Sequence, residues 1–310
     1  MEITEKKTVT VGIAAYNEEK NIRQILNQII NQKGGNFILE KIIVVSDGSN
    51  DSTVKTIQQI KNNLISVKEY SQRKGKPART NELMQMASSD ILILIDADVK
   101  IANQFLIRDL VIPLKQKNIY LASGVAIPLK PETTVEHIVA TGICLWNEAK
   151  TAKNMSMMYK CEGQIRALKK ELYTELKFPL ASADDVYPFL YCQKKKYGFA
   201  AVDSAIVYFR LPQTFKDYRK QMNRYLVSYH IQKENFGNEI TKKFYTVNLS
   251  TKIYIVAKNI FKDPFWVSLY LLFLTIPKFL SLFKIGDKKS NWNIIKTTKN
   301  IKTKYRQSLS

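Results

Sequence analysis

The sequence contains few of the residues that build zinc-hydrolase or disulfide-rich sites. Its 310 residues include two histidines, His137 and His230, and no HExxH pattern, which argues against a zinc hydrolase. Its three cysteines, Cys144, Cys161 and Cys192, lie far apart and have no metal-binding spacing. We therefore expect buried thiols in a reducing compartment and not a disulfide framework.

Two common phosphate-binding patterns are also missing. No GxxxxGK[ST] pattern occurs, which argues against a P-loop ATPase, and no GxGxxG follows the first predicted strand, which argues against a dinucleotide-binding dehydrogenase. The first residues, MEITEKKTVTV, lack the apolar core of a signal peptide. We therefore expect the first domain to stay in the cytosol.

Acidic residues are scarce relative to basic ones. The chain has 48 Lys and Arg against 27 Asp and Glu, which gives a net charge of +21, although its hydrophobic content of 45% is ordinary for a globular protein. This excess indicates an anionic partner, which could be nucleic acid, nucleotide phosphates or an anionic membrane surface. A nucleic-acid-binding protein is the alternative from a different functional class. No zinc-finger, helix-turn-helix or RNP-like pattern supports it, so we do not expect a nucleic-acid partner.

One stretch organises the predicted fold. Residues 91–95 are five consecutive aliphatic residues, which predict a central strand of a parallel sheet. Asp96 and Asp98 follow directly, at the end of the strand where open α/β sheets bind ligands. The alternative is an ordinary strand-to-loop turn, in which Asp is common.

Strands and helices alternate through the first hundred residues. Strands are predicted over 8–15, 41–46 and 65–70, and helices over about 18–32, from residue 51 or 52 to 60, and over 78–88. Asn17 is the expected N-cap of the first helix. The alternation predicts an α/β fold with a doubly wound, mostly parallel sheet and flanking helices. Polar residues follow three of the strands, so we expect them to converge on one crevice.

The second part of the chain is less regular. We expect helices over about 103–117, 134–150 and 214–235, and strands over 120–127, 159–168 and 198–208. The uninterrupted apolar run of 265–275 is shorter than the roughly 20 residues of a spanning helix, and the apolar texture that continues to 283 is interrupted by Pro277 and Lys278. We expect 263–285 to form an interfacial or re-entrant hairpin, with a short single span or a buried helix as alternatives. Eight Lys or Arg and one acid follow between 284 and 310, which favours an anionic membrane surface.

Several short segments together resemble a known family. They are AYNEE at 15–19, SDGSNDST at 46–53, GKPARTN at 75–81, DAD at 96–98, ADD at 183–185 and QMNRY at 221–225. In this order they look like the signatures of the family 2 inverting glycosyltransferases of GT-A fold, in the synthase-like branch that carries a QxxRW motif. The resemblance covers about residues 8–237.

The resemblance implies a nucleotide-sugar site in the first half of the chain. Ala15, Asn17 and Glu18 match the motif that lines the nucleoside pocket. Asp47 matches the acid that hydrogen-bonds the base, which is usually uracil. Lys76 matches the basic loop near the nucleotide.

The resemblance also implies a metal and a catalytic base. Asp96 matches the ribose and metal-side position, and Asp98 matches the direct ligand to Mg²⁺ or Mn²⁺, cations that prefer carboxylate oxygens. Asp185 matches the base that deprotonates the acceptor, and Asp184 beside it, on the acceptor side, would raise the proton affinity of Asp185. A helix N-terminal cap is the alternative role of this acidic pair.

The third part of the resemblance lies on the long helix near residue 221. Gln221 and Arg224 match residues that contact the diphosphate and the acceptor region, and the alternative is a solvated pair spaced i, i+3. Tyr225 stands on the acceptor side where the family usually has Trp, and Asp184 stands where it usually has Glu. We expect altered acceptor contact and not its loss.

These residues lead to a functional expectation and a division of the chain. We expect a metal-dependent hexosyltransferase that moves a sugar from a nucleotide donor, a UDP-sugar first, to a glycan or lipid-linked acceptor at the cytoplasmic face of a membrane. The alternative is the catalytic subunit of a processive polysaccharide synthase that needs a membrane partner subunit. The expected parts are a GT-A region at 1–237 (nucleotide half 1–100, acceptor half 101–237), an amphipathic connector at 238–262, a membrane-associated segment at 263–286 and a basic tail at 287–310.

Overall fold

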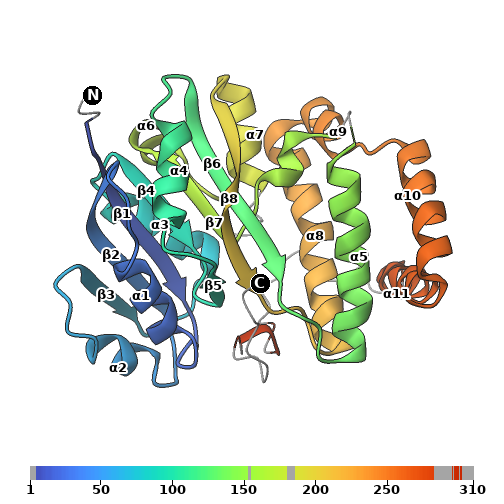
Figure 1. The fold of residues 1–310 in the computed structure, drawn as a ribbon, viewed down its shortest axis with the longest axis horizontal. Coiled ribbons are helices and arrows are strands. Elements are labelled where there is room, and N and C mark those ends of the chain that lie inside the picture. Colours follow the sequence, from blue (N-terminus) through green and yellow to red (C-terminus); the bar gives the residue numbers. More distant parts are fainter. Residues whose placement is uncertain are drawn as a thin grey trace.

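The computed structural model describes residues 5–152, 155–179, 186–282, 295, 297–299 and 301. Within them, eight strands form one sheet in the order β3-β2-β1-β4-β7-β6-β8-β5 (Figure 1). The strands are β1 (Lys7–Ala15), β2 (Phe37–Asp47), β3 (Ile65–Tyr70), β4 (Ile91–Ile95), β5 (Val99–Ile101), β6 (Ile119–Pro128), β7 (Ile165–Lys169) and β8 (Gly198–Phe209). The pairings β1–β2, β2–β3, β1–β4 and β6–β8 are parallel, whereas β7 is antiparallel to both its neighbours and β5 is antiparallel to β8. The predicted α/β fold with a mostly parallel sheet is confirmed.

Helices cover both faces of the sheet and extend beyond its β8 side (Figure 1). They are α1 (Ile22–Ile30), α2 (Thr53–Gln58), α3 (Lys76–Met86), α4 (Leu106–Leu114), α5 (Thr134–Lys150), α6 (Lys170–Glu175), α7 (Val186–Lys195), α8 (Phe215–Phe236), α9 (Asn238–Tyr245), α10 (Leu249–Lys262) and α11 (Pro264–Leu282), with 3-10 turns η1 (Met157–Lys160) and η2 (Thr297–Lys299). Figure 1 shows α5, α8, α10 and α11 gathered at the end of the molecule away from β3.

Strand β4 is buried from both faces, as its aliphatic run predicts. Ile91, Ile93 and Ile95 point into the core beneath α1 and α4, whereas Leu92 and Leu94 point into the core beneath α3 and α6. Each of these side chains is at most 5% exposed. Since burying one such side chain stabilises a protein by about 1.5–3 kcal/mol, β4 and its parallel neighbour β1 hold the centre of the sheet.

Two local predictions were wrong at the edges of elements. Helix α1 begins at Ile22 and its N-cap is Asn21, whereas Asn17 has a φ of 53° and cannot cap a helix from that left-handed conformation. Residues 17–20 instead form a loop between β1 and α1. The segment 159–168, predicted as one strand, contains the end of the turn η1 and most of the shorter strand β7. Strand β7 pairs with β4 over the five residues of β4, which limits its length.

The hairpin expected over 263–285 was also wrong. The chain forms one helix, α11, from Pro264 to Leu282, and it passes through position 277 without ending. Val267 is buried and the Tyr270 ring lies so close to Gly142 of α5 that a Cβ there would overlap it, so packing against α5 sustains the helix. The connector at 238–262 consists of the two helices α9 and α10. No described helix is both long and apolar enough to cross a bilayer.

The close approach of β6 and β8 generates a stability prediction. A Cβ added to Gly124 would overlap the backbone carbonyl oxygen of Ala205, which cannot move without shifting β8. We expect Gly124→Ala to lower the free energy of unfolding by about 1–3 kcal/mol, as overpacking typically does. Gly35→Ala is the matched control because nothing lies within 4 Å of its Cβ position, and urea unfolding of both variants gives the comparison. Equal midpoints would show that β8 yields easily at this contact.

Candidate functional site

A cavity of about 270 Å³ lies at the carboxyl ends of β1, β2 and β4. The structure brings nine residues predicted for the site to its wall. They are Ala15, Glu18, Asp47, Lys76, Asp96, Asp98, Gln221, Arg224 and Tyr225. Asn17 does not line the cavity, and Asp184 and Asp185 lie outside the described residues. The expected convergence of strand ends is therefore present, and the role of each side chain stays a prediction.

Asp47 is held by the loop that follows β3. Its carboxylate accepts hydrogen bonds from the backbone N–H groups of Lys74 (2.7 Å) and Gly75 (2.8 Å) and from Nε of Arg79 (2.7 Å). Arg79 is fully buried, binds Glu82 as well, and stacks on the Tyr70 ring at 3.6 Å. Three of about four acceptor positions of this carboxylate are therefore occupied, so Asp47 fixes the basic loop and keeps one position on Oδ2 for a further donor such as a nucleobase N–H.

Asp96 and Asp98 differ in their surroundings. The ammonium of Lys76, at the start of α3, lies 2.5 Å from Oδ1 of Asp96. Asp98 forms no ion pair with any residue that the structure describes. The described residues contain no cluster of three or more His, Cys, Asp or Glu side chains suited to a metal. Two carboxylates still fit Mg²⁺ or Mn²⁺, because such cations are commonly held by one or two carboxylates together with substrate phosphates and water.

Asn17 joins the loops after β1 and β2. Its amide nitrogen donates to Oδ1 of Asn50 (2.7 Å), its amide oxygen accepts from the Asn50 backbone (2.9 Å), and its backbone N–H donates to Ser49 (3.1 Å). The side chain thus braces two loops beside the cavity. Asn17 adopts a left-handed φ of 53°, which is unfavourable for most residues, and the next residue, Glu18, lines the cavity.

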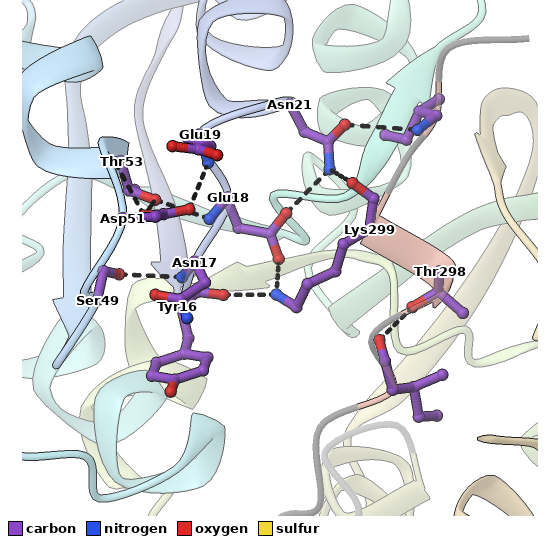
Figure 2. A network of polar contacts seen from close by, with 12 residues as sticks. Tyr16, Asn17, Glu18, Glu19, Asn21, Ser49, Asp51, Thr53, Thr298 and Lys299 are labelled. Carbon is purple, nitrogen blue, oxygen red and sulfur yellow. Dashed lines mark hydrogen bonds and ion pairs between the residues drawn. The ribbon is translucent and has the colours of Figure 1, made fainter. Parts of the chain in front are cut away.

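Glu18 is the most perturbed acid of the site. It is 5% exposed, its backbone N–H donates to Thr53, and its carboxylate accepts from Asn21 and binds the ammonium of Lys299 (Figure 2). The pKa of Glu18 is raised to about 8, because burial and the nearby Asp98 raise it by more than Lys299 and Asn21 lower it. Two acids and one lysine therefore lie close together in one part of the cavity.

Lys299 reaches the cavity from far along the sequence. Its carbonyl oxygen accepts from the Asn21 amide (2.8 Å), and its ammonium donates to the Tyr16 carbonyl oxygen (Figure 2). Thr297 anchors the same segment by donating from its backbone and hydroxyl to Asp217 of α8, at 3.1 and 2.9 Å. The basic composition of the tail was the only sequence signal for this contribution, and it pointed to a membrane instead.

The start of α8 supplies the opposite wall. Thr214 caps the helix by accepting a hydrogen bond from the Asp217 backbone N–H. Gln221 and Tyr225 are four residues apart, so they lie on the same face of the helix, one turn apart. The Gln221 amide lies 3.4 Å from the Tyr225 hydroxyl, and Tyr225 is half-exposed. Gln221, Arg224 and Tyr225 all line the cavity, and their roles stay predictions.

Other residues of the wall have no recognisable pattern. Arg73, whose guanidinium lies 4.8 Å from the Tyr16 ring, brings further positive charge, whereas Arg210 is ion-paired with both Glu132 and Glu136 at 3.1 Å. Glu162 also lines the cavity and is bound by Lys150 of α5 at 2.7 Å. These residues lie in loops or at strand ends, where periodicity gives no signal. Their position in the cavity wall became apparent only from the fold.

Comparisons with known proteins agree with this geometry. The family described as Glycosyl transferase family 2 matches residues 10–170, slightly more than half of the chain. A segment of 97 residues is 31% identical to the poly-beta-1,6-N-acetyl-D-glucosamine synthase of Staphylococcus aureus (strain COL) and covers 31% of this chain. That match spans only 23% of the length of the synthase.

Two solved structures share the fold. A mannosyltransferase, PcManGT, from Pyrobaculum calidifontis, solved in complex with GDP-Man and Mn²⁺, has a TM-score of 0.62 at 19% identity and covers 91% of this chain and 82% of its own. Glucosyl-3-phosphoglycerate synthase from Mycobacterium tuberculosis, solved with Mg²⁺ and UDP, has a TM-score of 0.54 at 17% identity and covers 74% and 80%. At these identities the likeness shows the fold, which is the predicted GT-A type.

The raised pKa of Glu18 generates a pH prediction. The folded chain holds the Glu18 proton up to about pH 8, whereas the unfolded chain releases it near 4.5, so the wild type loses stability as the pH rises between these values. The Glu18→Gln variant lacks this titration. Its free energy of unfolding, relative to that of the wild type, should therefore rise by at least about 1 kcal/mol from pH 5 to pH 8. Urea unfolding across this range measures the difference. The exposed neighbour variant Glu19→Gln is the control, and parallel pH profiles for Glu18→Gln and the wild type would refute the assignment.

Proposed function

Because the chain belongs to glycosyl transferase family 2, we propose that it is an inverting, divalent-metal-dependent hexosyltransferase that uses a nucleotide-sugar donor, a UDP-sugar first. The acceptor in this proposal is a glycan or lipid-linked glycan in polysaccharide or glycolipid synthesis. The likeness to a polysaccharide synthase supports this class of product. The UDP and GDP-Man in the solved relatives support a nucleotide donor and leave the choice of base to experiment.

One observation carries the proposal: acids and cations from distant segments line a single cavity at the sheet edge. Asp96 and Asp98 come from the end of β4, Lys76 from α3 and Arg224 from α8. A nucleoside diphosphate needs this mixture, because its phosphates require positive charge whereas a bridging cation requires carboxylates. The cavity therefore suits a donor that carries both.

The reaction requires one bond to form and one to break. An acceptor hydroxyl oxygen bonds to the anomeric carbon of the donor sugar, the bond from that carbon to the diphosphate oxygen breaks, and its electron pair leaves with the nucleoside diphosphate. The hydroxyl proton passes to a carboxylate, a role that we assign to Asp185. Attack from the face opposite the diphosphate inverts the anomeric centre.

The leaving group needs charge neutralisation. Mg²⁺ or Mn²⁺, held by Asp98 and shared with Asp96, would supply Lewis-acid stabilisation of the diphosphate. Lys76 and Arg224 add positive charge from opposite walls of the cavity, and Lys299 adds it from the tail. Lysine acts here as a point charge and arginine as a planar donor pair.

We also propose that the protein works at the cytoplasmic face of a membrane, bound peripherally or anchored through α10 and α11. These helices expose large apolar side chains: Leu249, Ile253, Tyr254, Phe261, Phe265 and Leu272. Lys258 and Lys262 lie among them, and the basic tail follows. Aromatic and aliphatic groups beside lysines are suited to the interface of an anionic leaflet. The same surface could hold a membrane partner subunit if the chain belongs to a processive synthase.

The catalytic assignment predicts the effect of removing each acid. We expect Asp98→Ala and Asp185→Asn each to lower sugar transfer at least about 100-fold, since one removes a metal ligand and the other the general base. Release of nucleoside diphosphate from UDP- and GDP-sugars with Mn²⁺ measures this loss. Asp203→Asn, an exposed acid of β8, should leave the rate unchanged. If Glu162→Gln abolishes transfer and Asp185→Asn does not, the base is Glu162 instead.

The exposed apolar residues predict membrane binding. Phe261 and Phe265 are 87% and 66% exposed, so the double variant Phe261→Glu/Phe265→Glu should fold normally. We expect it to bind vesicles of phosphatidylcholine and phosphatidylglycerol more than tenfold more weakly, because each buried aromatic ring contributes about 1.5–3 kcal/mol. Flotation assays compare it with Ile112→Glu, which alters an equally apolar exposed residue of α4. Equal flotation of both variants would exclude this surface.

A further inference from the structure

A second cavity, of about 430 Å³, adjoins the cavity at the carboxyl ends of β1, β2 and β4, which we call the donor cavity because the proposed function places the nucleotide sugar there. It lies between α5 and α8, and Tyr270 of α11 and Tyr159 of η1 close it. The two cavities share wall residues: Glu162, Gln164, Phe209, Gln221 and Tyr225. Figure 1 shows α5 and α8 side by side at the end of the sheet. A group bound in the second cavity would therefore meet the donor at this shared wall.

Most of the second cavity is apolar, yet three of its polar atoms have no partner. The hydroxyls of Tyr218 and Ser228 and Oε1 of Gln164 are buried and form no hydrogen bond within the described part of the chain. Tyr218 and Ser228 are each 3% exposed. Buried polar atoms without partners are costly and rare, and here three of them line one cavity. Their unfavourable contribution to stability is explained if a ligand forms hydrogen bonds with them when it binds.

The helical spacing explains how α8 serves both cavities. Tyr218, Gln221, Tyr225 and Ser228 recur every three or four residues, so they lie along one face of the helix. Burial raises the pKa of Tyr218, which keeps its hydroxyl protonated and able to donate a hydrogen bond. The face thus presents two hydroxyls to the second cavity on the same side of the helix as Gln221 and Tyr225.

Aromatic rings make up much of the remaining wall. Trp146 meets Tyr159 edge to face at 4.7 Å, and Tyr245 and Tyr270 also contribute. A sugar ring has apolar C–H faces that pack on aromatic rings and hydroxyls that pair with scattered polar atoms. An alkyl chain would cover the same rings but would leave all three polar atoms without partners. The lining therefore favours a saccharide over a lipid tail.

We propose that the second cavity binds the terminal sugar residue of the acceptor, with Tyr218, Ser228 and Gln164 as hydrogen-bond partners of its hydroxyls. This proposal rests on the proposed glycosyltransferase function and adds the chemical class of the acceptor end. The sugar enters between α5 and α8 and presents one hydroxyl to the donor at the wall shared by both cavities. A lipid attached to the glycan stays outside this cavity.

Variants that remove one hydroxyl each test the proposal on the full chain. In the absence of sugar, Tyr218→Phe and Ser228→Ala should leave Tm unchanged or raise it, because they delete a buried group that has no partner. Ser66→Ala is the matched control, since the Ser66 hydroxyl is also buried without a partner but lies in β3, far from the cavity. A hydroxyl with a purely structural role would lower Tm when removed.

Binding and turnover supply the second readout. With UDP and Mn²⁺ present, saturation-transfer NMR probes the wild type with cellobiose, N,N′-diacetylchitobiose and decanol. We expect at least one disaccharide to bind, and Tyr218→Phe or Ser228→Ala to weaken it about tenfold, which is the loss of one hydrogen bond. Donor hydrolysis should stay unchanged in both variants, and Ser66→Ala should behave as the wild type in every assay.

The outcomes separate this proposal from the one on which it rests. Binding of decanol with no disaccharide would overturn it in favour of an alkyl occupant. Unchanged disaccharide affinity in both variants, or a lowered Tm, would also overturn it while donor hydrolysis still supported the glycosyltransferase. Absence of nucleotide binding and hydrolysis in the wild type would instead refute the proposed function itself.

Discussion

The burial of β4 from both faces is the constraint on which the molecule depends. Its isoleucines and leucines alternate between two cores, so the strand cannot shift by one residue without exchanging the two sets. This register places Asp96 and Asp98 at the sheet edge, beside the ends of β1 and β2. The apolar interior thus positions the charged groups of the cavity, and packing sets the geometry of the chemistry.

Residues close together in sequence were predictable. The aliphatic run of β4, the acids that follow three strands and the helical spacing near Gln221 all express local rules, and the structure places Glu18, Asp47 and Asp98 in one cavity. The partners of those acids were not predictable in the same way. Arg79 binds Asp47 and Lys299 binds Glu18 only because the fold joins separate segments, and no period in the sequence marks either contact. Helix α11 likewise depends on the surface that α5 offers, which composition alone does not reveal.

The two adjoining cavities divide the site by polarity. The cavity at the strand ends holds ionic pairs at short distances, whereas the second cavity is lined by rings and a few neutral polar atoms. The long helix α8 forms a wall of both, and Gln221 and Tyr225 lie where they meet. If the two cavities bind donor and acceptor as proposed, this one helix sets the distance between the two substrates, which is the main requirement of a transfer between bound groups.

The contact between Glu18 and Lys299 also has a consequence for the order of folding. It closes a loop of nearly the whole described chain, and contacts of such long sequence separation form late even though the entropy of closure grows only slowly with loop length. The sheet and its aliphatic core can assemble from nearby segments before the tail arrives. The cavity at the strand ends therefore gains its last wall at the end of folding, and a chain cut at residue 237 would lack both Lys299 in that wall and the apolar side chains of α9 that pack against the core.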